Sequence, residues 1–224
     1  MTTKVFAATL GLNVLFLATG CLQLAFSLVA QSRMDSEPPD GRKALRNLLY
    51  QKLPLTAAVV NGALVLATFV FTLLGLVTPR KGALKMGAFL VILCGLFTLG
   101  LGAHLWIMTL RLRDAFFPTY LDLDPAVQSL IQQSFQCCGY YNAARPAFVT
   151  DPACPSPAAA ALLRGCGTAV SGFSNSFLDH VFTTLFGMVG VDAIFILSIA
   201  CLLKDCKERE RYRHIDEKNG HRQI

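Results

Sequence analysis

Two neighbouring cysteines, Cys137 and Cys138, are the residues of this sequence with the most obvious chemical potential. Adjacent thiols could serve a metal site, a redox switch, a nucleophile or a pair of disulfide bonds. Zinc ligands are usually spaced by two to four residues, and no histidine stands close to this pair. A nucleophilic cysteine needs an activating base, and the histidine of the same hydrophilic segment, His180, is 42 residues beyond Cys138. Structural disulfides are therefore the expected chemistry.

Two further cysteines of the segment, Cys154 and Cys166, supply partners for the pair. Four cysteines allow three connectivities. A bond between Cys137 and Cys138 would need a strained geometry, so two connectivities stay open. Closing loops of roughly 15 to 30 residues stabilises a fold by about 3 kcal/mol each on the chain-entropy model. No cofactor, metal ion or enzymatic activity is expected from the sequence.

Four apolar runs must position this segment. The chain has 224 residues, of which 54% are hydrophobic and 15% charged, a composition typical of membrane proteins. A helix of roughly 20 apolar residues crosses a hydrocarbon core of about 30 Å. The sequence predicts an all-α membrane protein with spans at residues 5–29, 53–77, 86–110 and 181–203. The first run is longer than a signal sequence, and we expect it to be retained.

Basic residues set the expected topology. Residues 1–4, 78–85 and 204–224 hold 11 Lys and Arg within about 32 residues, whereas residues 30–52 and 111–180 hold 9 within about 92. This density predicts that both termini and the turn at 78–85 are cytosolic. Residues 30–52 then form a small extracellular loop and residues 111–180 a large one, with a small disulfide-stapled helical domain between the third and fourth spans.

Short helices are expected in both outer loops. In the small loop, the spacing of Ala44, Leu45, Leu48 and Leu49 predicts a helix that packs against the larger loop or lies on the bilayer. In the large loop, a leader precedes a helix that begins at Asp124-Pro125 and ends at Gly139, with the double cysteine on its buried side. A second helix is predicted from Ser156 to Arg164.

The ordered set of features resembles the tetraspanin family over essentially the whole chain. It comprises four spans, a small and then a large outer loop, the motif Cys137-Cys138-Gly139 and the later Cys154 and Gly165-Cys166. The resemblance implies disulfides Cys137–Cys166 and Cys138–Cys154. Two departures are the absence of cysteines in the inside turn and of a glutamate in the third span. They put in doubt an acylation site at the turn and the polar contact usual in that span.

The large outer loop is short for this family, and in this it is similar to the loop of the tetraspanins of filamentous fungi. This branch is associated with the plasma membrane during polarised growth and the emergence of penetration structures. The resemblance implies a non-enzymatic organiser or scaffold of membrane microdomains at the plasma membrane, and also at endosomal or vacuolar membranes. Its expected partners are other membrane proteins, further tetraspanin copies and the lipid bilayer. No nucleic acid and no small-molecule substrate is expected.

Polar residues inside the spans suggest a second site. Asp192 stands 11 residues after Val181, about 16 Å from the outer edge of the fourth span. Asn13 of the first span is expected roughly 18 Å from the same edge. We therefore expect a hydrogen-bonded contact between Asn13 and Asp192. The alternative is a proton or ion relay of Asp192 with His104, as in a small four-helix transporter or channel.

Other candidate sites lie outside the hydrocarbon core. Cys206 and Cys201, at the inner end of the fourth span, suit palmitoylation. Tyr212 and Ile215 have the spacing of a tyrosine-based sorting motif. The candidate partner surface consists of three aromatic residues of the large loop that we expect to be exposed or to pack within the small domain: Tyr140, Tyr141 and Phe148.

Overall fold

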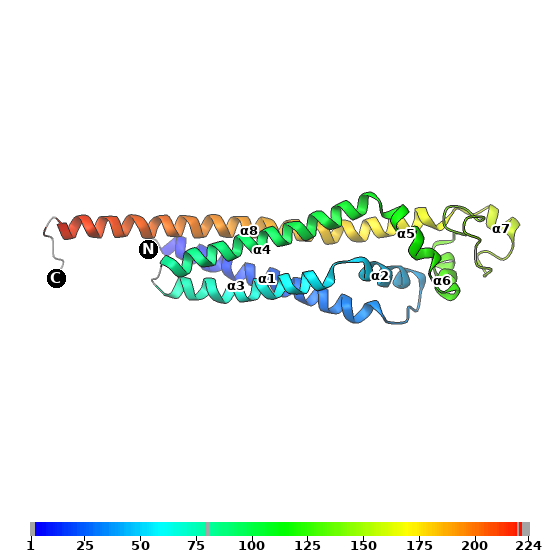
Figure 1. Cartoon of the computed structure of the whole chain (residues 1–224), viewed down its shortest axis with the longest axis horizontal. Helices are drawn as coiled ribbons and strands as arrows, with labels where there is room; N and C mark the ends of the chain where they lie inside the picture. Colours follow the sequence, from blue (N-terminus) through cyan, green and yellow to red (C-terminus); the bar gives the residue numbers. More distant parts are fainter. Residues whose placement is uncertain (1–2, 79–80, 219, 221–224) are drawn as a thin grey trace. The chain divides into compact units, whose positions relative to one another are not determined.

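A computed structural model describes residues 3–78, 81–218 and 220 of the chain. These residues form eight helices (Figure 1). Four of the helices are long and apolar enough to cross a membrane: α1 (Thr3–Met34), α3 (Leu55–Val77), α4 (Lys81–Leu110) and α8 (Cys166–Lys218). The expected membrane protein with four helical spans is confirmed at this level. Pro79 and Arg80 of the expected inside turn lie outside the described residues.

Three of the long helices extend well beyond the apolar runs that predicted them. The apolar run of α8 was expected at 181–203, but the helix begins at Cys166 and ends at Lys218. Hydropathy marks only the part of a helix that suits lipid, whereas the backbone hydrogen bonds continue until a residue interrupts them. No proline follows Pro157 in the sequence. In contrast, α3 starts only at Leu55, directly after Pro54.

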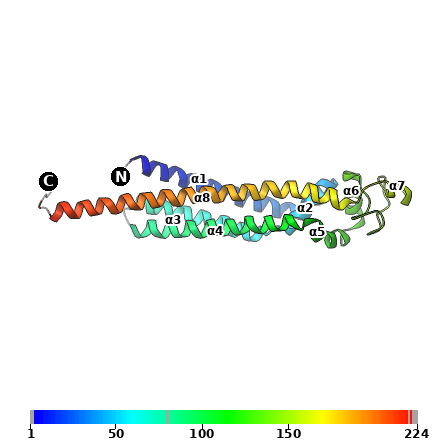
Figure 2. The same cartoon turned by 90° about the horizontal axis from the view of Figure 1, so that it is seen from above.

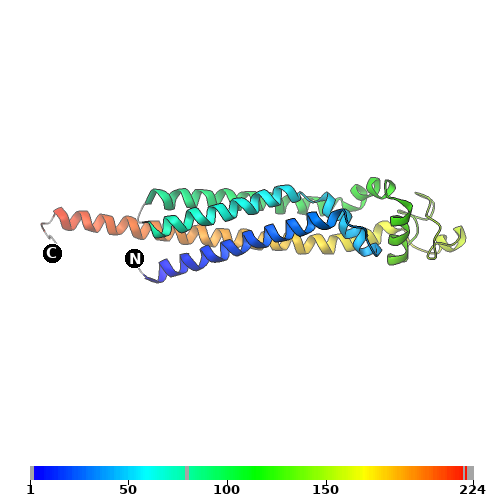
Figure 3. The same cartoon turned by 90° about the horizontal axis from the view of Figure 1, so that it is seen from below.

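The chain divides into two compact units. The span unit consists of the described residues of Met1–Ala25, Ala57–Gly100 and Leu185–Ile224. Segments of α1, α3, α4 and α8 run side by side in it (Figures 1, 2 and 3). Its apolar core joins all four helices through buried side chains such as Phe16, Val65, Val91 and Phe195. The rings of Phe16 and Phe195 lie 5.4 Å apart between centroids.

The stapled unit consists of Phe26–Thr56 and Leu101–Thr184. It contains four shorter helices, α2 (Gly41–Lys52), α5 (Leu112–Leu121), α6 (Pro125–Phe135) and α7 (Pro157–Ala161). The leader before Asp124 is therefore largely helical, which differs from the expectation. The first turn of α5 has no capping side chain, and its sequence carries Pro118, so local signals for this helix are weak.

Side-chain caps start the other three short helices. Asp40 accepts a hydrogen bond from the Lys43 amide at the start of α2, Asp124 accepts one from Ala126 at α6, and Ser156 accepts one from Ala159 at α7. These bonds satisfy amide groups that a helix leaves without partners in its first turn. The predicted starts of α6 and α7 are confirmed, while both helices end earlier than expected.

Helix α2 packs against α6, as one of the two sequence-based alternatives predicted. The Gly41 amide donates a hydrogen bond of 3.0 Å to the Ser134 hydroxyl. A Cβ atom at Gly41 would lie 2.2 Å from the Leu130 carbonyl oxygen, so this contact requires glycine. The opposite ends of the apolar side of α2, Ala44 and Leu49, are buried. The small loop thus becomes one wall of the stapled unit.

Candidate functional site

The double cysteine lies just after α6, where the backbone changes direction. Helix α6 ends at Phe135, and Gln136 takes the left-handed conformation with φ 49°. The helix was expected to end at Gly139, which is three residues beyond the observed C-cap, Gln136. Cys137 and Cys138 are both fully buried, so the expectation that the pair faces the interior is confirmed.

Two disulfides leave this point in different directions. Cys137 is bonded to Cys166, 29 residues away in sequence, and Cys138 is bonded to Cys154, 16 residues away. This is the connectivity that the tetraspanin resemblance implies. Because the four sulfur atoms are bonded in two pairs, none of these cysteines is a free thiol. The two bonds bracket α7, whose five residues could not hold a helix without such anchors.

Backbone hydrogen bonds reinforce the disulfides. The Cys138 amide donates to the Arg164 carbonyl at 3.1 Å, and the Cys166 amide donates to the Gly139 carbonyl at 2.8 Å. The Gly167 amide donates to the Tyr140 carbonyl at 2.8 Å. A Cβ atom at Gly165 would lie 2.3 Å from the Tyr141 carbonyl oxygen. Only glycine allows the two segments to approach this closely.

A buried polar cluster holds the loop between the disulfides against α6. The Gln132 amide nitrogen donates to the Val149 carbonyl at 2.7 Å and to the Asp151 carboxylate at 2.8 Å. The other carboxylate oxygen of Asp151 accepts hydrogen bonds from the Ala153 and Cys154 amides. Sequence reasoning missed this cluster. A glutamine on the apolar side of the helix was the available signal, because a buried amide requires partners.

The three aromatic residues of the expected partner surface have different surroundings. Tyr140 is 0% exposed and its hydroxyl donates to the Arg113 carbonyl, so it packs within the small domain, the second of the two expected environments. Its ring lies 5.3 Å from that of Phe117 and 5.1 Å from that of Tyr120. Burial raises the pKa of the Tyr140 hydroxyl. Phe148 is half-buried against the cluster around Cys138.

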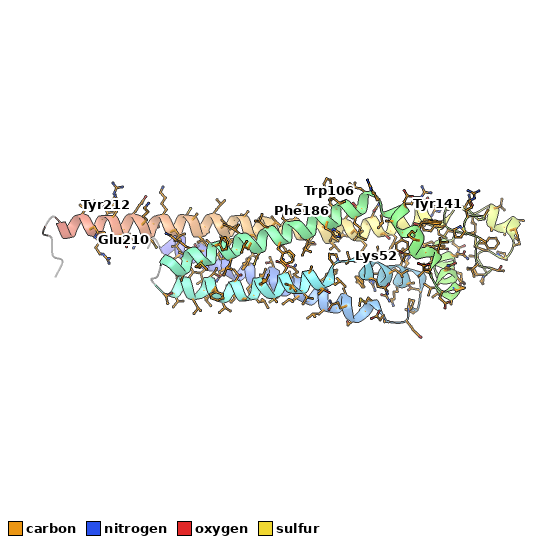
Figure 4. All side chains as sticks on the ribbon, viewed as in Figure 1. Lys52, Trp106, Tyr141, Phe186, Glu210 and Tyr212 are labelled. Carbon is orange, nitrogen blue, oxygen red and sulfur yellow. A yellow bond between two sulfur atoms is a disulfide. The ribbon has the colours of Figure 1, made fainter. Side chains whose placement is uncertain are left out.

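Tyr141 is the exposed member of the three, with 38% of its surface accessible (Figure 4). Its hydroxyl donates to an Asp114 carboxylate oxygen at 3.0 Å. The guanidinium carbon of Arg113 lies 5.4 Å from the centre of its ring, which is a cation–π distance. These contacts hold Tyr141 at the surface in a fixed orientation.

Inside the span unit, the expected contact between Asn13 and Asp192 is not formed. The side-chain Oδ1 atom of Asn13 accepts a hydrogen bond of 2.7 Å from the Thr72 hydroxyl, and its side-chain Nδ2 atom has no partner among the described residues. Asp192 is 3% exposed. A Cβ atom at Gly95 would lie 3.4 Å from its Oδ2 atom, so the carboxyl group packs on α4. An equal expected depth does not decide which neighbour each helix face meets.

A second buried polar contact joins three helices of the span unit. The Asn61 amide nitrogen on α3 donates to Gln23 Oε1 on α1 at 3.2 Å and to the Thr98 hydroxyl on α4 at 2.8 Å. Thr98 in turn donates to the Cys94 carbonyl at 2.9 Å. Sequence reasoning did not predict this contact. Single polar residues inside apolar runs were the signal that could have found the contact.

The remaining predicted residues are accessible. His104 belongs to the stapled unit and its side chain is exposed. At the far end of α8, Cys201 is exposed and Cys206 is half-buried. Tyr212 is 67% exposed and Ile215 is exposed on the same helical tail (Figure 4). The tail of α8 is thus the solvated helical extension that its alternating charges predict.

No known family model, curated protein or solved structure matches the chain.

Proposed function

We propose that this chain is a non-enzymatic membrane organiser of the tetraspanin kind, which associates laterally with other membrane proteins and with copies of itself. The observation that carries the proposal is the branching of the double cysteine to Cys166 and Cys154, on either side of α7. In this arrangement the cysteines hold a small surface in a fixed shape. A rigid surface suits recognition, because less conformational freedom is lost when a partner binds.

The proposed location is the plasma membrane, with both termini in the cytosol and the stapled unit outside the cell. The density of basic residues supports this orientation. Disulfides persist in oxidising surroundings, which also favours an extracellular stapled unit. By its likeness to the fungal branch we place the protein in polarised growth and in the emergence of penetration structures, with endosomal or vacuolar membranes as further locations.

Two features of the tail of α8 support regulated clustering. Cys201 and Cys206 are accessible cysteines next to the expected inner membrane surface, where S-acylation occurs. Acyl chains would strengthen lateral clustering. Tyr212 and Ile215 are accessible to a sorting adaptor. Acyl exchange on the wild type, Cys201→Ser and Cys206→Ser tests the first feature, with loss of label in Cys206→Ser as the expected result and an unlabelled wild type as the contrary one.

A small transporter or channel is the alternative, and the buried carboxyl group of Asp192 is the observation that favours it. A transporter needs a polar path, yet the polar side chains of the span unit pair locally, such as Asn13 with Thr72 and Asn61 with Thr98. Buried polar pairs of this kind serve helix association in membranes. The organiser is therefore the better supported function.

Purification in mild detergent followed by mass spectrometry tests the proposal. The wild type should bring down a reproducible set of membrane proteins, and exchange of the segment Tyr140–Arg164 for an unrelated loop should change that set. A harsher detergent provides the control, because it should remove lateral partners from both proteins. An unchanged set after the exchange would assign recognition to the spans, and the absence of any membrane protein would contradict the proposed function.

A further inference from the structure

Arg113 contacts the exposed ring of Tyr141, and two further arginines of the stapled unit, Arg145 and Arg164, lie near Tyr141 through the backbone. Arg113 contacts the ring directly, at 5.4 Å from its centroid. The Tyr141 amide donates to the Arg145 carbonyl at 3.2 Å, which places Arg145 beside Tyr141 through the backbone. Arg164 precedes Gly165, where an added Cβ atom would lie 2.3 Å from the Tyr141 carbonyl oxygen. All three arginine side chains are exposed.

The three arginines of this surface outnumber its acidic residues. The segment from Gln136 to Gly165 contains one acidic residue, Asp151, and its carboxylate is buried and accepts three hydrogen bonds. Asp114 stands next to Tyr141 and accepts the bond from its hydroxyl. Among the described residues, no carboxylate forms an ion pair with any of the three arginines.

An exposed apolar side chain lies two residues before Arg164. Leu162 caps the end of α7 and is 88% exposed. The residues around it, Pro152 to Leu163, carry no charge. With so little of its surface covered, Leu162 does not pack in the core of the stapled unit, and it offers an apolar side chain close to Arg164 in the sequence.

We propose that Arg113, Tyr141, Arg145, Leu162 and Arg164 form a recognition face for an acidic segment with apolar side chains on the extracellular part of a partner membrane protein. The inference rests on the proposed function and specifies the partner's chemistry. Guanidinium groups bind carboxylates through paired hydrogen bonds. Tyrosine and arginine supply most of the binding energy in many interfaces. A sulfated glycan would satisfy the arginines, but it offers no apolar group for Leu162, which favours a peptide.

Binding of a labelled peptide to the intact chain in phosphatidylcholine nanodiscs tests this face. The probe is a short fluorescein-labelled peptide of alternating Glu and Leu, and its fluorescence anisotropy is measured. Arg145→Gln and Arg164→Gln should each weaken binding about tenfold. The matched control is Arg42→Gln, which removes the same charge from an exposed position on α2 of the same unit and should leave the affinity unchanged. Leu162→Ser should weaken binding of this probe but not of an all-Glu peptide.

Three results would overturn the inference. They are equal losses in Arg42→Gln and Arg145→Gln, absence of binding by the wild type, and tighter arginine-dependent binding of heparin fragments or phosphatidylserine vesicles than of the peptide. Co-purification separates this inference from the proposed function. Membrane partners that bind the wild type and the arginine variants equally would leave the organiser intact and refute the face. Peptide binding without any co-purified membrane protein would support the face and contradict the proposed organiser.

Discussion

Replacing Gly41 with alanine tests the contact between α2 and α6, on which the shape of the stapled unit depends. The added Cβ atom would lie 2.2 Å from the Leu130 carbonyl oxygen and 2.8 Å from the Ile131 Cα. Both atoms belong to the backbone, so one helix must shift. Overpacking of this kind costs typically 1–3 kcal/mol, and a backbone neighbour places it near the upper end. Because Gly41 is the first residue of α2, the higher helix propensity of alanine offsets little of this cost, which leaves a loss of roughly 2–3 kcal/mol.

Gly172→Ala is the matched control for this prediction. Gly172 lies in α8 within the same unit, and no atom lies within 4 Å of the position of its added Cβ. Here alanine should stabilise the helix by about 0.5–1 kcal/mol. The assay is thermal unfolding of the purified chain in detergent, followed in parallel by protease cleavage within the stapled unit. Equal melting temperatures for the two variants would refute the close contact of α2 with α6.

Four further predictions concern buried polar groups. Tyr120→Phe should be neutral or stabilising in the same unfolding assay, because the Tyr120 hydroxyl is buried without a partner among the described residues, whereas Tyr140→Phe should cost about 1 kcal/mol through its lost hydrogen bond to Arg113. Burial raises the pKa of Tyr120 to about 12 from 10.0, so ionisation of this group should cost the wild type up to about 3 kcal/mol as pH rises through this window, since the unfolded chain ionises first. Tyr140, whose pKa burial also raises, acts in the same direction, so the Tyr120→Phe variant should lose less than the wild type, and an equal loss would assign the effect elsewhere. Asn61→Leu should lower stability by roughly 1–3 kcal/mol, since two interhelical hydrogen bonds are lost, and an unchanged melting temperature would show that the contact contributes nothing. Asp192→Asn should leave surface delivery and stability near the wild type if the carboxyl group serves packing, and loss of function with normal delivery would instead support the relay.

Local signals predicted much of the secondary structure. Asp124-Pro125 and Ser156-Pro157 marked the starts of α6 and α7, because caps and first-turn prolines act within a few residues of one another. The apolar runs located the four long helices because hydropathy is also a property of neighbouring residues in the sequence. Helix α5 escaped notice since its stability derives from burial of Phe116 and Tyr120 in a core contributed by distant segments.

Contacts between distant segments were harder to predict. The aromatic pair Tyr140 and Tyr141 gave no indication of which ring is buried, because that depends on the approach of Gly165 and Gly167 from the far side of α7. Likewise, hydropathy gave an expected depth for Asn13 but not the rotation of its helix, and the side chain meets Thr72 instead of Asp192. Depth follows from the rise per residue, while rotation follows from side-chain packing.

Photo-crosslinking in intact cells tests the central claim of lateral association most directly. A benzophenone amino acid is placed at Tyr141, in the exposed part of the stapled unit, and in a second variant at Leu197, which is exposed on α8 in the span unit. The account predicts that both positions capture other membrane proteins and that the two sets overlap. Crosslinks to lipid alone at Leu197, together with no captured protein at Tyr141, would contradict it.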